Sequence, residues 1–236
     1  MSQKFWVVIP AAGAGRRMET NIPKQYLLLR GKRVIDWTLS CFLNHPQIEG
    51  VVVAISEGDP YWDNLEFDHA KLTTVVGGEE RSDSVLNALH RLSQMADDND
   101  WVLVHDAARP CLSQTDLDHL LDELKGHPVG GVLGTPISDT VKQTNAADEV
   151  IDTPDRSQLW RAFTPQMFHL RALTDALMDA EREGKRVTDD ASAMELAGFH
   201  PKMVMGRADN IKITQPRDLQ LAELYLKELN REEQAK

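Results

Sequence analysis

Short, continuous runs of β-branched and other apolar residues alternate along the chain with amphipathic stretches. Such runs are typical of strands that are buried on both faces of a parallel sheet. We expect strands at residues 5–9, 51–55, 72–76, 101–105 and 130–137. The stretches between them carry apolar residues at helical spacing, which predicts helices over residues 34–44, 82–96 and 115–125, the last capped by Thr115.

The alternation is interrupted between residues 138 and 160. Two short extended stretches, 140–144 and 150–153, flank a polar turn at 145–148. This arrangement predicts a β-hairpin arm that projects from the sheet. An excursion of this kind often serves association between subunits, and a plain surface hairpin is the alternative.

After the interruption the alternation resumes. We expect two helices, over residues 170–183 and 189–197, the second capped by Thr188, then strands at 202–205 and 211–214 and a final amphipathic helix from Arg217. The chain is therefore predicted to form a single domain, residues 1–236, of the α/β class. Its Rossmann-like, mostly parallel sheet is flanked by helices and carries the projecting β-hairpin arm.

Polar and glycine-rich segments follow Ile9, Val76 and His105, which close three of the predicted strands. The carboxyl ends of parallel strands meet at one edge of the sheet, and ligands bind there in open α/β folds. We therefore expect one shared site built from these three segments.

The composition of the chain argues against two classes of binding partner, nucleic acids and membranes. The net charge of −11 leaves no basic stripe for a nucleic-acid backbone. No apolar run approaches the 18 residues of a membrane span, and the run at residues 5–9 is too short for a signal peptide. The two cysteines, Cys41 and Cys111, form neither a disulfide framework nor a metal-ligand set. These features predict a cytoplasmic protein that binds neither nucleic acid nor membrane.

The loop after the first strand is suited to a phosphate. Gly13 and Gly15 allow close approach of the backbone, and amides at a helix start favour phosphate oxygens. A dinucleotide fingerprint would need glycine where Met18 stands, and the Gly-Lys-Ser/Thr of a P-loop is absent. Arg16, Arg17 and Lys24 follow the glycines instead. Fixed cations of this kind stabilise the charge that develops on a phosphorus under attack, so the loop favours an enzyme that acts at phosphorus.

Several segments together resemble, in one order, the 2-C-methyl-D-erythritol 4-phosphate cytidylyltransferase family. They are residues 10–18 with 23–25, then 77–85, 105–110, 164–166, 188–190 and 206–212. The similarity runs from about Val7 to the last helix. It implies an enzyme that joins CTP to 2-C-methyl-D-erythritol 4-phosphate and releases diphosphate in non-mevalonate isoprenoid synthesis.

The resemblance also implies residue roles. Four basic residues would stabilise the reacting phosphorus or orient the acceptor phosphate: Arg17, Lys24, Arg156 and Lys212. The nucleotide would be bound by Ala11, Ala12, Gly13, Gly15, Lys24, Gly78, Glu79, Ser84, Asp106 and Ala107. The acceptor would be bound by Asp106, Arg109, Thr140, Arg156, Thr188 and Lys212. Mg²⁺ would be held mainly by the CTP phosphates, with Asp106 as a protein contact. In this family the arm reaches across a homodimer.

Alternatives remain open at this stage. The nucleophile would already be an anionic phosphate, so no strong base is needed, and we expect His105 to satisfy a hydrogen bond at a strand end. Arg109 could brace the Asp106 loop instead of binding substrate, and Arg81 could be an ion-pair partner instead of a ligand contact. A cytidylyltransferase for ribitol 5-phosphate would carry nearly the same CTP loop. A non-catalytic CTP sensor is the alternative from a different class.

Overall fold

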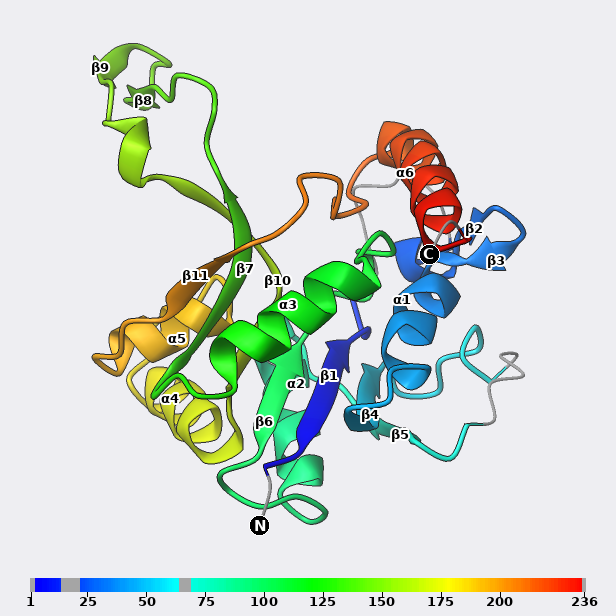
Figure 1. Ribbon diagram of the computed structural model, residues 1–236. Helices are drawn as coiled ribbons and strands as arrows, with labels where there is room; N and C mark the ends of the chain where they lie inside the picture. Colours follow the sequence, from blue (N-terminus) through cyan, green and yellow to red (C-terminus); the bar gives the residue numbers. More distant parts are fainter. Residues whose placement is uncertain (1–2, 14–21, 64–68, 235–236) are drawn as a thin grey trace.

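The computed structural model describes residues 3–13, 22–63 and 69–234, and its centre is a seven-stranded sheet with the order β11-β7-β10-β6-β1-β4-β5 (Figure 1). The strands are β1 (Phe5–Pro10), β4 (Ile48–Ile55), β5 (Leu72–Val76), β6 (Trp101–Val104), β7 (Gly130–Pro136), β10 (Trp160–His169) and β11 (Lys202–Met205). β1 pairs in parallel with β4 and β6, β4 with β5, and β7 with β11. The prediction of a mostly parallel sheet is confirmed.

β10 is the strand of the central sheet that the apolar pattern does not reveal. It runs antiparallel between β6 and β7, and its register to β7 shifts between Ala162 and Gln166. Pro165 lies inside this interruption, and a proline in a central strand argues against a strand assignment. The irregular register accommodates the proline and places Thr164 and Gln166 beside the end of β6.

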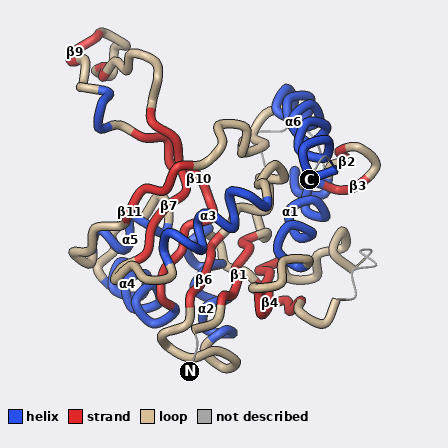
Figure 2. Tube along the Cα trace, in the orientation of Figure 1, coloured by secondary structure: helices blue, strands red, loops and turns tan. Residues whose placement is uncertain are grey.

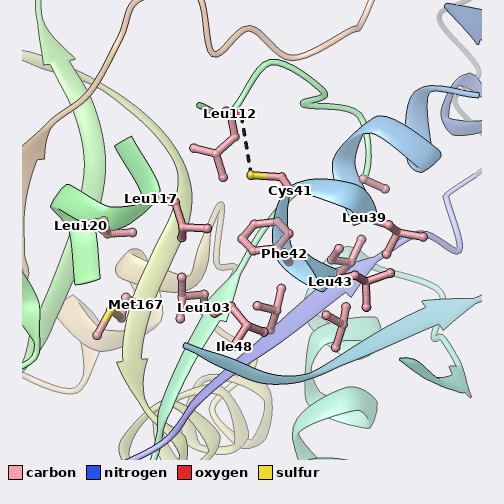
Figure 3. Packing of buried hydrophobic residues seen from close by; sticks show 14 of the residues in the cluster. Leu39, Cys41, Phe42, Leu43, Ile48, Leu103, Leu112, Leu117, Leu120 and Met167 are labelled. Carbon is pink, nitrogen blue, oxygen red and sulfur yellow. Dashed lines mark hydrogen bonds between the residues drawn. The ribbon is translucent and has the colours of Figure 1, made fainter. Parts of the chain in front are cut away.

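Helices cover both faces of the sheet. They are α1 (Val34–Leu43), α2 (Arg81–Leu92), α3 (Gln114–Leu124), α4 (Leu170–Arg182), α5 (Asp190–Leu196) and α6 (Pro216–Gln234). β1 shows why there are two faces, because Val7 and Ile9 pack with α1 and α3 whereas Val8 packs with α2, α4 and α5. The first of these clusters is drawn in Figure 3. None of the described helices is long and apolar enough to cross a bilayer.

Three short elements precede α1 in the chain. They are a 3₁₀ turn, η2 (Lys24–Tyr26), and the hairpin strands β2 (Leu28–Leu29) and β3 (Lys32–Arg33). α6 packs behind them in a third apolar cluster with Leu29, Cys111 and Ile213. Leu226 and Leu229 form part of its buried stripe, as the helical spacing predicted.

The projecting arm is confirmed. β7 and β10 extend beyond the helices into it, and most of its length is loop (Figure 2). Its tip holds the two-stranded pair β8 (Gln143–Thr144) and β9 (Val150–Asp152), and the turn η3 (Arg156–Gln158) returns toward β10. Val150 and Ile151 are 58% and 59% exposed.

Two predicted caps are wrong by one or two residues. Ser113, not Thr115, caps α3, because its hydroxyl accepts a hydrogen bond from the Asp116 amide at 3.0 Å. Asp189, not Thr188, caps α5 by accepting from the Ser192 amide at 3.0 Å. In both cases the capping oxygen lies three residues before the amide that it bonds, which is the spacing that an N-cap requires.

The strand predicted at residues 211–214 is absent from the structure. Ile213 is fully buried among α6 and its neighbours, and its amide donates to Ala108 O at 2.8 Å. The apolar pattern of residues 211–214 therefore reflects the burial of an irregular segment that packs against the loop after β6. Because of this contact, Lys212 faces that loop.

Candidate active site

A pocket opens where β1, β5 and β6 end, as the polar segments after these strands predicted. Its walls come from the exit of β1, from η2, from the loop and first turn of α2, from the loop after β6 and from the segment before α6. The lining residues are Pro10, Ala11, Ala12, Gly13, Lys24, Gln25, Gly78, Glu79, Glu80, Arg81, Ser84, Asp106, Ala107, Ala108 and Lys212.

Gln25 fixes the backbone where the chain leaves β1. Its buried side-chain amide donates to Ala11 O at 2.7 Å and to Gly13 O at 3.2 Å. The Ala11 amide in turn donates to Ala54 O of β4 at 2.7 Å. Gln25 received no role from the sequence, although it directly follows Lys24; a polar residue beside the predicted catalytic lysine was the available signal. The predicted Gly15 and Arg17 lie outside the described residues.

The loop before α2 packs closely against the exit of β1. A Cβ on Gly77 would lie 2.6 Å from the Ala12 Cβ, so only glycine allows this approach. The Gly78 amide donates to Ser84 Oγ at 3.1 Å, and the Ser84 hydroxyl lies 3.2 Å from Glu80 O, which accepts from it. Three of the predicted nucleotide-binding residues, Gly78, Glu79 and Ser84, therefore line one wall of the pocket, and the hydroxyl of Ser84 is hydrogen-bonded within the loop.

Asp106 is the centre of the charged part of the site. Its Oδ1 lies 3.1 Å from Arg81 Nε, and its Oδ2 lies 2.9 Å from Lys212 Nζ and 3.3 Å from Arg109 Nε. Burial by itself would raise the pKa of Asp106, but the charges of Arg81, Lys212 and Arg109 outweigh it and hold this pKa well below its ordinary value. The carboxylate is therefore ionised, and it holds three cations around one end of the pocket.

Arg109 supports the loop after β6. Besides its contact with Asp106, it donates to Asn210 O at 2.7 Å and lies over the Phe163 ring at 5.3 Å. Asn210 donates to Thr164 O at 2.8 Å. These contacts agree with the interpretation that Arg109 braces the Asp106 loop. Its predicted contact with the acceptor stays a prediction.

His105 is fully buried and satisfies hydrogen bonds at the end of β6, so that prediction is confirmed. Its Nε2 lies 3.0 Å from Arg109 O, and because a carbonyl can only accept, Nε2 carries the proton. Its Nδ1 lies 3.0 Å from the Thr164 hydroxyl. Burial lowers the pKa of His105 to about 4, so the ring is neutral at pH 7.

Arg81 bridges two carboxylates, and this favours the ion-pair interpretation. It bonds Asp106 and also Asp190 Oδ2, at 2.8 Å. Burial would lower the pKa of Arg81, but the charges of Asp190 and Asp106 raise it. Asp190 is buried and does not line the pocket. No role was predicted for Asp190, although it lies in the segment 188–190 that resembles the family.

The remaining predicted acceptor residues lie outside this pocket. Thr188 is exposed on the rim of a neighbouring hollow that it shares with Arg81. Thr140 and Arg156 are exposed on the arm, where Arg156 donates to Ser138 O. Within one chain the structure therefore brings together Lys212 and those predicted nucleotide residues that it describes, Asp106 among them, but it leaves the arm residues apart.

The carboxylates of the pocket indicate how the predicted Mg²⁺ could be bound. Among the described residues no cluster of three or more His, Cys, Asp or Glu side chains could hold an ion. Asp106, Glu79 and Glu80 nevertheless line the pocket. Mg²⁺ commonly takes one or two carboxylates together with substrate phosphates, so this donor set fits an ion carried mainly by a triphosphate.

Comparisons with known proteins agree with one another. The family model described as 2-C-methyl-D-erythritol 4-phosphate cytidylyltransferase matches residues 5–228. The chain is 54% identical over 218 residues to the protein of that name from Pseudomonas fluorescens (strain Pf0-1), covering 92% of this chain and 93% of the relative. It is 51% identical over 220 residues to that from Vibrio vulnificus (strain YJ016), covering 93% of each. The crystal structure of the Francisella tularensis enzyme is 38% identical, with a TM-score of 0.82, and covers 94% of this chain and 100% of that one.

Proposed function

Because the chain belongs to the 2-C-methyl-D-erythritol 4-phosphate cytidylyltransferase family, we propose that this pocket transfers a cytidylyl group from CTP to 2-C-methyl-D-erythritol 4-phosphate. The products are 4-diphosphocytidyl-2-C-methyl-D-erythritol and diphosphate, in the non-mevalonate route to isoprenoid precursors. The observation that carries the proposal is the cluster of Arg81, Arg109 and Lys212 around Asp106, beside the glycine-bearing exit of β1.

The reaction joins two anions. An oxygen of the acceptor phosphate attacks the α-phosphorus of CTP, a new P–O bond forms, and the bond to the β-phosphate breaks as diphosphate leaves. The attacking oxygen is already ionised, so no side chain has to remove a proton. The neutral, hydrogen-bonded state of His105 is consistent with this chemistry. The protein's task is positioning and charge stabilisation.

CTP would occupy the walls formed by the exit of β1 and the start of α2. Backbone groups of Ala11, Ala12 and Gly13 would follow the phosphates and ribose, and the loop from Gly78 to Ser84 would read the base. Lys24 enters the pocket from η2. It would stabilise the charge that develops at the α-phosphorus, together with Arg17.

The acceptor would bind at the charged end. Lys212 is one-third exposed beside Asp106, so its ammonium can reach a phosphate while Asp106 faces hydroxyl groups. The predicted contacts Thr140 and Arg156 would come from the arm of a second subunit. The exposed apolar side chains at the tip of the arm support such an association in a homodimer.

Mg²⁺ would be bound mainly by the triphosphate, and Asp106 would be the protein residue that contacts the ion. When bound, the ion would neutralise part of the triphosphate charge. The remaining positioning and charge stabilisation would come from described residues of the pocket. Lys24 and Lys212 orient and stabilise the phosphates, and the hydrogen bonds of Gln25 hold the backbone that surrounds them.

Diphosphate release from purified protein with CTP, Mg²⁺ and 2-C-methyl-D-erythritol 4-phosphate tests the proposal. We expect release that depends on both substrates. CTP binding without product would contradict catalysis and favour a sensor.

The shared site needs a separate test. Lys24→Ala and Arg156→Ala subunits, each impaired alone, should regain part of the activity when mixed into verified hybrid dimers. One site in the hybrid would contain neither substitution if Arg156 works in the partner's pocket. Hybrid dimers without recovery would contradict the shared site.

A further inference from the structure

Asp190 is a buried carboxylate that contacts the site without lining it. It is the first residue of α5 and is 1% exposed. Its Oδ2 accepts a hydrogen bond from Arg81 Nη2 at 2.8 Å. Removing a carboxylate from water is costly unless a partner compensates, and Arg81 provides that compensation.

Helix capping does not explain why a charged carboxylate is buried at Asp190. The capping function belongs to the preceding Asp189, which accepts from the Ser192 amide and from Gln166 Nε2. Asp190 Oδ1 is buried without a hydrogen-bond partner among the described residues. The carboxylate of Asp190 is thus oriented by Arg81 and not by the start of its own helix.

Arg81 in turn occupies a position where a cation needs compensation. It is the first residue of α2, and a positive charge at a helix N-terminus is unfavourable because of the helix dipole. Two carboxylates offset it, with Asp190 on one nitrogen and Asp106 Oδ1 on Nε at 3.1 Å. The planar guanidinium fixes the directions of both contacts.

We propose that Asp190 is a positioning residue for the reaction, because it holds Arg81 in the orientation that leaves Asp106 Oδ2 facing Lys212. The inference rests on the proposed function. Without the charge of Asp190, Arg81 has Asp106 as its one remaining carboxylate partner among the described contacts and is drawn onto it. Asp106 Oδ2 then turns from Lys212, which lies 2.9 Å away in the structure.

The test compares kcat/KM for the acceptor, measured by diphosphate release, in four proteins. They are the unaltered chain, Asp190→Asn, Arg81→Met and the double variant. Asp190→Asn keeps the size of the side chain and an oxygen that accepts from Arg81, but removes the charge. Asp189→Asn is the control for loss of a charge in the same segment, because asparagine is an equally good N-cap and the side-chain hydrogen bonds of Asp189 go to Ser192 and Gln166, not to Arg81. Melting temperatures are recorded for every variant.

We expect Asp190→Asn to lower kcat/KM about tenfold and Asp189→Asn to change it less than about twofold. In the Arg81→Met background, Asp190→Asn should change kcat/KM less than about twofold, because the residue acts through Arg81. A role confined to folding would instead lower the melting temperature and give the same fold loss in both backgrounds, which would overturn the inference. Full activity of Asp190→Asn would also overturn it.

Arg81→Lys provides a second test without altering α5. Lysine keeps the positive charge but lacks the planar fork that bonds both carboxylates, so we expect a loss of kcat/KM similar to that of Asp190→Asn. Normal activity of Arg81→Lys would contradict the proposed relay. If the unaltered chain releases no diphosphate, the proposed function fails; if it does and the variants match it, the positioning role alone fails.

Discussion

Asp106→Asn is the substitution that most directly perturbs the charged cluster. The change removes one negative charge from a residue that is 7% exposed and whose carboxylate contacts Arg81, Arg109 and Lys212. Breaking a buried ion pair by removing one partner costs about 3–5 kcal/mol. Asparagine keeps one acceptor oxygen, so we expect the lower end, about 3 kcal/mol. For a chain of this length that corresponds to a fall in melting temperature of about 6–12 °C.

The assay is thermal unfolding at pH 7, followed by the fluorescence of the five tryptophans. Asp116→Asn is the matched control, since Asp116 is also 7% exposed and accepts from the Arg207 amide. Burial raises the pKa of Asp116, so its charge is unfavourable in the folded state. We expect Asp116→Asn to leave the free energy of unfolding within about 1 kcal/mol or to raise it. Equal effects of the two substitutions would refute the reasoning.

The pH dependence of the free energy of unfolding provides a second test of the Asp106 ion pairs. The pKa of Asp106 in the folded state is below its ordinary value of 3.8. Its contribution to stability is therefore complete above about pH 5 and is lost as the pH falls below 3.8 toward the folded pKa. The stability difference between the unaltered chain and Asp106→Asn should stay constant from about pH 7 to pH 5 and should narrow at lower pH. A difference that grows on acidification would contradict this account.

Three further predictions concern the walls of the site and one helix cap. Lys24→Ala should lower kcat for diphosphate release about 10²-fold or more, because one preorganised cation is lost; near-normal turnover would remove Lys24 from the mechanism. Gln25→Leu should weaken CTP binding about tenfold in calorimetric titration, since two hydrogen bonds that fix the backbone disappear, and unchanged affinity would count against that role. Ser113→Ala should lower the free energy of unfolding in urea by about 1 kcal/mol, whereas Thr115→Ala should have a smaller effect; the reverse order would contradict the cap assignment.

The central strands and helices could be predicted because their burial imposes a plain pattern. β5 was predicted at its observed bounds, and β1 and β6 within one residue. β10 was missed because Pro165 and polar neighbours interrupt its apolar pattern, while pairing on both sides stabilises it. The segment around Ile213 was mistaken for a strand because burial alone produces the same apolar signature.

The site was predictable where a motif follows a strand and not where distant segments meet. Asp106 and Lys212 were both identified, and their 2.9 Å contact follows from the tertiary fold. Asp190 was missed because its partner Arg81 is 109 residues away in the chain. Gln25 was missed because its contacts are with backbone carbonyls, which a sequence pattern does not display.

The acceptor that the pocket uses is the most direct test of the central claim. Diphosphate release would be measured with CTP and Mg²⁺ and either 2-C-methyl-D-erythritol 4-phosphate or ribitol 5-phosphate, at equal concentrations and with the cytidylyl product identified by mass spectrometry. We expect efficient turnover of 2-C-methyl-D-erythritol 4-phosphate and a much lower kcat/KM for ribitol 5-phosphate. A clear preference for ribitol 5-phosphate would contradict the proposed function.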